Sequence, residues 1–123
     1  MNRRRPPARD DGTAVGLAGV GLAMAGMLTV VAIDAGAYLL AASRAQAVAD
    51  AAALAAAIAI DDGRPASAAA RKVAAAADAE VVGCDCTTLP VEVKVGVQVI
   101  GLVIPTLGPR RVVATSHATM LEP

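Results

Sequence analysis

Residues 13–33, TAVGLAGVGLAMAGMLTVVAI, form a run of 21 residues without a charged side chain. At about 1.5 Å per residue, a helix of this length spans roughly 31 Å, which matches the hydrocarbon core of a bilayer. The run contains four glycines, which weaken a helix in water but are tolerated in lipid, where no water competes for the backbone hydrogen bonds. We therefore expect a transmembrane helix over 13–34, preceded by a cytoplasmic basic tail over 1–12.

Basic residues are concentrated on one side of this run. Arg44 is the only basic residue near its far end, whereas four precede it: Arg3, Arg4, Arg5 and Arg9. The positive-inside rule then predicts a single-pass protein of the cell membrane, with a cytoplasmic N-terminus and an extracytoplasmic C-terminal domain. The alternative is a secretory signal cleaved near Ala35-Gly36-Ala37, which would release a soluble envelope domain. The uncharged run exceeds the ~7–15 apolar residues of such a signal, which favours a retained anchor.

Composition excludes several functional classes. The 123 residues carry a formal net charge of zero, and Tyr38 is the only aromatic residue. Such a chain has neither a basic surface nor an aromatic platform for nucleic acid, and few bulky side chains with which to build a deep pocket. It also lacks a phosphate-binding glycine motif and a nucleophile elbow, and it has a single histidine. We expect no enzymatic activity, no cofactor, no metal site and no small-molecule substrate.

The apolar run continues without a helix-breaking signal into an alanine-rich stretch, residues 35–60. Alanine is the strongest helix former, so this stretch predicts a helical stalk that extends the transmembrane helix. Ser43, Gln46 and Asp50 fall on one narrow polar stripe of that helix. The remaining surface is too apolar to stand alone in water, and we expect it to pack against the distal domain or neighbouring subunits.

Two segments resemble a known family: VAIDAG at 31–36 and AQAVADAAALAAA at 45–57. Together they resemble the N-terminal signature of the TadE/TadG-like proteins of Flp (tight-adherence) pilus assembly, especially the short forms found in helicase-and-secretion gene neighbourhoods. Five positions carry the match and would be those used in subunit packing: Asp34, Gly36, Gln46, Asp50 and Leu54.

The resemblance implies a pilin-like structural or assembly subunit of a Flp-type pilus or related secretion system, acting by helix packing. Its partners would be the lipid bilayer and pilus or secretion-system membrane proteins, or further copies of the chain. The rival to this hypothesis is a membrane-anchored accessory protein unrelated to pili. Many relatives carry a Glu about five residues beyond a Gly at the membrane edge, where a peptidase cuts. Gly12 is followed by no such Glu, so we expect an unprocessed chain.

Asp34 is the first charged residue after the uncharged run. A carboxylate costs about 2.5–3.5 kcal/mol at the centre of a bilayer and far less at its surface. We expect Asp34 to be a solvated interfacial residue that fixes the depth of the helix. The alternative is a lateral contact with a neighbouring subunit.

A breaker cluster at Asp61–Pro65 ends the first helix, and the pattern at 66–79 predicts a second helix that folds back as a helical hairpin. Arg71 and Lys72 on this helix are interpreted as a solvated face, because a nucleic-acid surface needs a longer basic stripe.

From Glu80 the pattern changes to alternation, typical of strands, over 80–86, 91–99 and 111–121. The simplest assembly is a three-stranded antiparallel meander over 80–123, its valine face covered by the alanine-rich helices, and thus an α+β fold. Between the last two strands, the uncharged stretch Ile100–Pro109 either extends a strand or forms an exposed apolar patch that contacts a partner or the membrane surface.

Cys84 and Cys86 are the only cysteines. Residues i and i+2 of an extended strand lie about 6.5–7 Å apart, which is long for a disulfide. A local disulfide, an intermolecular disulfide and two free thiols all remain open. A metal site that combines the pair with His117 lacks the usual ligand spacing, and we interpret His117 as a surface residue.

Overall fold

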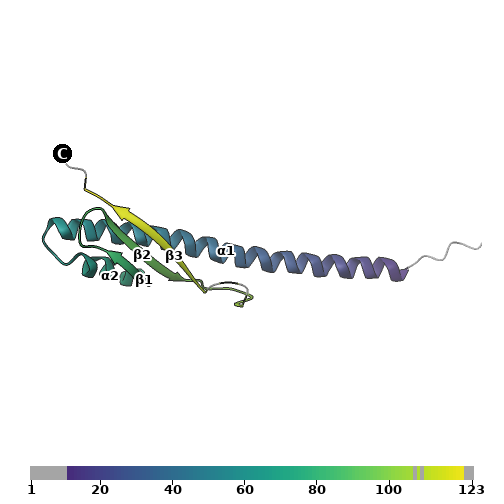
Figure 1. Ribbon diagram of the computed structural model, residues 1–123. Coiled ribbons are helices and arrows are strands. Elements are labelled where there is room, and N and C mark those ends of the chain that lie inside the picture. Colours follow the sequence, from purple (N-terminus) through teal and green to yellow (C-terminus); the bar gives the residue numbers. More distant parts are fainter. Residues whose placement is uncertain (1–10, 107, 109, 121–123) are drawn as a thin grey trace, which may run out of the picture. The chain divides into compact units, whose positions relative to one another are not determined.

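The computed structural model describes residues 11–106, 108 and 110–120, and it confirms the α+β class (Figure 1). The elements are α1 (Asp11–Asp61), α2 (Ala66–Ala76), β1 (Glu80–Asp85), β2 (Val91–Gln98) and β3 (Arg111–Ala118). The chain divides into two compact units, residues 1–32 and residues 33–123. The predicted basic tail, with its four arginines, falls largely on residues 1–10, outside the described residues.

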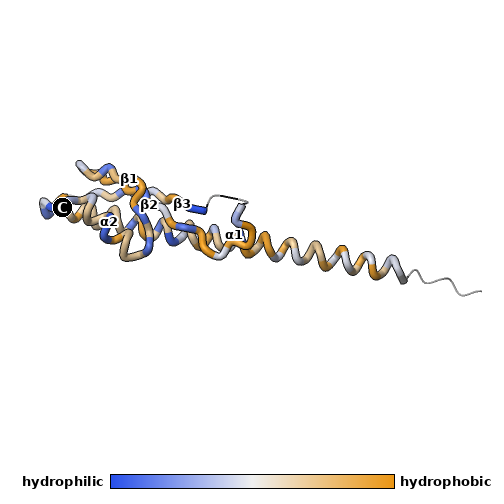
Figure 2. The backbone as a smooth tube through the Cα atoms, turned by 90° about the horizontal axis from the view of Figure 1, so that it is seen from below, coloured by the Kyte–Doolittle hydropathy of each residue, from blue (hydrophilic) through white to orange (hydrophobic). Residues whose placement is uncertain are grey.

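The described residues of the first unit all belong to the N-terminal part of α1. Nearly all side chains from Gly12 to Ile33 are exposed, among them Leu17 at 72% and Leu22 at 79%. Figure 2 shows apolar residues distributed along this part of the helix. The helix is long and apolar enough to cross a membrane.

In the second unit, one side of α1 is buried and is almost entirely alanine. The buried residues recur with helical spacing and are Ala41, Ala45, Val48, Ala49, Ala52, Ala53, Ala56, Ala57 and Ala59. β2 and β3 run alongside this part of α1 (Figure 1). The valine side chains of β2 and the alanines of α1 and α2 belong to one hydrophobic cluster.

The sheet has the order β1-β2-β3 with both pairs antiparallel, as the sequence predicts. Alternation along β2 buries Val91, Val93, Val95 and Val97, each at most 3% exposed. Complete burial of one such side chain stabilises the fold by about 1.5–3 kcal/mol. The central strand therefore supplies the bulky half of a core whose other half is alanine, and the predicted helical cover over the valine face is confirmed.

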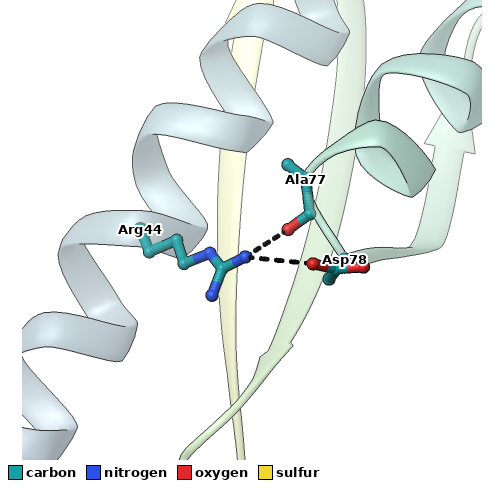
Figure 3. Close-up of polar contacts among 3 residues, drawn as sticks. All are labelled: Arg44, Ala77 and Asp78. Atoms are coloured by element: carbon teal, nitrogen blue, oxygen red, sulfur yellow. Dashed lines mark hydrogen bonds and ion pairs between the residues drawn. The ribbon is translucent and has the colours of Figure 1, made fainter.

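α2 packs its alanines, Ala66, Ala70 and Ala74, into the same cluster. The predicted end at residue 79 is wrong: the helix ends at Ala76, and Asp78 adopts a left-handed φ of 52°. Arg44 of α1 donates to the carbonyl of Ala77 at 2.7 Å and lies 3.8 Å from the Asp78 carboxylate (Figure 3). A guanidinium at these terminal carbonyls complements the helix dipole, so Arg44 joins the end of α2 to α1.

The opposite face of the sheet is polar. Gly96 leaves room for the Arg111 side chain to cross β2 and reach Glu80 of β1 at 2.9 Å; a Cβ at Gly96 would lie 2.9 Å from Arg111 Cδ. The predicted strand ends shift slightly: β1 ends one residue earlier, and β3 ends at Ala118 and not at residue 121, which lies outside the described residues. A polar outer face leaves the alanine–valine layer as the core of this unit.

The alanine–valine layer predicts that leucine substitutions at two alanines of α1 differ strongly in their effect on stability. Ala56→Leu should destabilise the unit by about 1–3 kcal/mol, because the buried position has no room for a larger side chain. Ala51→Leu, at an exposed position, should change stability by less than about 0.5 kcal/mol. Urea unfolding of the detergent-solubilised chain, monitored by hydrogen exchange of the β2 amides, measures the stability of both variants. Equal effects would contradict this packing.

Candidate functional site

Asp34 lies on the buried side of α1, and the residue is 8% exposed. Its Oδ1 accepts a hydrogen bond from the backbone N–H of Val103 at 2.7 Å, and its Oδ2 accepts one from Ile104 at 3.3 Å. Hydrogen bonds to a charged acceptor are stronger than those between neutral groups, about 1.5–3 kcal/mol each. The carboxylate thus holds the segment between β2 and β3, about 70 residues further along the chain.

This finding corrects the expectation for Asp34. The carboxylate is not solvated, because backbone amides of its own chain replace water as hydrogen-bond donors. A buried carboxylate is tolerated only where such partners exist, and Asp34 has two.

The segment that Asp34 holds is the β2–β3 loop, residues 99–110. β2 ends at Gln98, so the alternative of a strand extension over 100–109 is wrong. The N–H of Val99 donates to the Arg110 carbonyl at 2.8 Å and closes the base of the loop. Gly101 adopts a φ of +86°, which favours glycine because it has no Cβ. The described residues of the loop therefore lie outside the sheet, and the Val99–Arg110 hydrogen bond joins the two ends of the loop.

A second residue of α1 contacts the same loop. Tyr38, one helical turn after Asp34, places its hydroxyl against Gly108, where no side chain would fit. Asp34 and Tyr38 thus hold the loop at two places along one side of the helix.

The other four positions of the resemblance lie on the outer side of α1. Gly36, Gln46, Asp50 and Leu54 are all exposed, and the side-chain amide of Gln46 donates to Asp50 Oδ1 at 2.9 Å. At 100° per residue these four positions fall within about a quarter of the helix circumference. The structure therefore separates the five positions: Asp34 faces the chain's own loop and the rest share an open face.

Large apolar side chains accompany the polar pair on this outer face. Leu40 is 73% exposed, Leu54 is 55% exposed and Ile58 is 41% exposed. Val48 of the same helix is instead buried in the core.

A shallow groove of about 320 Å³ lies between α1 and the end of β2. Its lining is mainly apolar and includes one arginine and one glutamine: Ala37, Leu40, Ala41, Arg44, Val97, Gln98 and Ile100. No acid–base pair or nucleophile is among these residues, so the groove offers shape and apolar surface.

The cysteines and the histidine are not among the residues of this groove: Cys84 lies on β1, Cys86 directly follows β1, and His117 lies on β3. Cys84 and Cys86 form a disulfide, with their Cα atoms 5.3 Å apart. This distance is shorter than in an extended strand, because β1 ends between them at Asp85. His117 is an exposed β3 residue 3.8 Å from Glu92, and no group of three metal-ligating side chains occurs among the described residues.

Comparison of the chain with models of protein families, with curated proteins and with solved structures finds no significant match.

The Asp34 contact predicts that Asp34→Ala frees the β2–β3 loop. Two backbone N–H groups lose their charged acceptor, and hydrogen exchange at 103–104 should accelerate roughly tenfold to a hundredfold. Asp34→Asn keeps one acceptor oxygen and should show a smaller effect. Asp50→Ala, which removes an exposed carboxylate of the same helix, serves as the control. Unchanged exchange in Asp34→Ala would show that the carboxylate does not hold the loop.

Proposed function

We propose that this chain is a single-pass membrane protein with a cytoplasmic N-terminus and an extracytoplasmic head. Within that class it serves as a TadE/TadG-like, pilin-like subunit of a Flp-type pilus or related secretion system. It acts by lateral packing of α1 against other membrane proteins or further copies of itself, and not by catalysis.

The observation that carries this proposal is the division of α1 into two faces. One face is buried in the core with the valines of β2, whereas Gly36, Leu54 and the Gln46–Asp50 pair are exposed on the other face. A small residue permits close approach of a second helix, and a hydrogen-bonded polar pair gives it a defined register. The resemblance to the TadE/TadG-like proteins includes these same four positions, and it rests on sequence alone, independently of the geometry of the helix.

The Asp34 contact supports a retained span over a cleaved signal. Cleavage near Ala37 would remove Asp34 and leave the amides of Val103 and Ile104 without their acceptor. A head built to be released would not depend on a residue upstream of the cut. The exposed apolar side chains of 12–33 then require lipid around them.

Two arginine substitutions at similarly exposed apolar positions test the packing proposal. Leu54 is 55% exposed on the outer face of α1, and Val113 is 52% exposed on the outer face of the sheet. Leu54→Arg should abolish the higher-mass complex of the protein, because a charge at a helix–helix contact loses its water without gaining a partner. Val113→Arg should leave that complex intact.

The measurement is native electrophoresis of membranes from the original host after extraction in mild detergent. Carbonate washing of the same membranes reports the anchor separately. A protein that withstands the wash and forms the same complex with either substitution is anchored but does not pack through this face. A protein removed by the wash contradicts the membrane anchor itself.

A further inference from the structure

The β2–β3 loop carries exposed apolar side chains at a fixed place in the chain. Ile100 is 78% exposed, Val103 is 51% exposed and Ile104 is 38% exposed. From Val99 to Pro109 the sequence contains no charged residue. Exposed aliphatic side chains without charged neighbours favour contact with an apolar surface such as lipid.

Asp34 sets the depth of this loop. It is the first charged residue after the uncharged run of 21 residues, so it lies at the membrane surface when that run spans a bilayer. The amides of Val103 and Ile104 are hydrogen-bonded to this carboxylate, and their side chains must therefore lie at nearly the same depth.

The contact also explains how a carboxylate can be buried at that level. Water becomes scarce toward the hydrocarbon, and an unpartnered carboxylate there is costly. Two backbone N–H groups replace the water, while the residues that supply them expose aliphatic side chains. Tyr38, beside Gly108 of the same loop, has the amphipathic ring that is enriched at membrane interfaces.

We propose that the β2–β3 loop is a second membrane contact, in which Ile100, Val103 and Ile104 enter the boundary between headgroups and acyl chains beside the end of the span. The inference rests on the proposed membrane anchor. Insertion of three aliphatic side chains next to a fixed helix restricts the tilt of the head relative to the bilayer. The exposed face of α1 is then presented to neighbours at one height above the membrane.

The absence of tryptophan from the chain allows a direct test with single-Trp variants. Ile104→Trp reports the loop. Leu89→Trp is the matched control: Leu89 is 39% exposed, about the same as Ile104, but Leu89 precedes β2 whereas the loop follows β2. Leu22→Trp, at a 79% exposed position of the uncharged run, reports the span itself.

Each full-length variant is reconstituted into phosphatidylcholine–phosphatidylglycerol vesicles without bromine, with lipids brominated on the upper acyl chain, or with lipids brominated near the end of the acyl chain. Insertion of about 5–10 Å brings the Trp of Ile104→Trp to the upper bromines, and its emission should fall by roughly half. Leu22 lies near the middle of the uncharged run, so the emission of Leu22→Trp should fall in the lipids brominated near the chain end. Leu89→Trp should be unaffected. Val103→Trp provides a second loop probe if Ile104→Trp disturbs the fold.

Quenching of Leu22→Trp without quenching of either loop variant would overturn the loop contact and leave the span intact. Equal quenching of Leu89→Trp and Ile104→Trp would also overturn it, because the head would then adhere without using the loop. Absence of quenching in Leu22→Trp would contradict the membrane anchor, and the loop contact with it.

Discussion

The close packing of an alanine face of α1 against the valine face of β2 is the constraint on which the second unit depends. Alanine brings little apolar area of its own, so the bulk has to come from the strand, and the four inward valines of β2 supply it. Among the larger apolar residues of this part of the helix, Val48 is buried on the side that faces the sheet, whereas Leu40, Leu54 and Ile58 lie on the other side, where they are exposed.

Asp34 marks the place where α1 changes its surroundings. Before it, the helix exposes apolar side chains all round, and after it, one side is buried against the sheet. A charged residue at this junction is compatible with burial only because the β2–β3 loop returns to it and donates two amides. One contact between residues about 70 positions apart thereby fixes the loop at the level where the apolar run ends. The proposed contact of the loop with the membrane depends on this level. The height at which the exposed face of α1 would meet neighbouring proteins depends on it as well.

Periodicity predicted most of the fold, because the signals are local. The uncharged run, the breaker at 61–65 and the alternation of 91–99 are each patterns of residues close together in the sequence. The long helix, its end and the central strand that they predict all lie close to the predicted positions. The environment of Asp34 was missed, because its partners are backbone amides distant in the sequence and carry no residue-type signal. Residues 45–57 show a similar limit: in an almost uniform alanine sequence, nothing local indicates which side faces the sheet.

Reactivity of single cysteines along α1 tests the two-faced helix most directly, since Cys84 and Cys86 are paired. In detergent-solubilised monomer, maleimide should modify Ala47→Cys and Ala51→Cys rapidly and Ala45→Cys and Ala52→Cys slowly, following the exposed and buried positions. In the membranes of the original host, the first pair should become protected as neighbours cover that face. Equal rates for the two pairs in the monomer, or unchanged reactivity of the first pair in those membranes, would contradict the account.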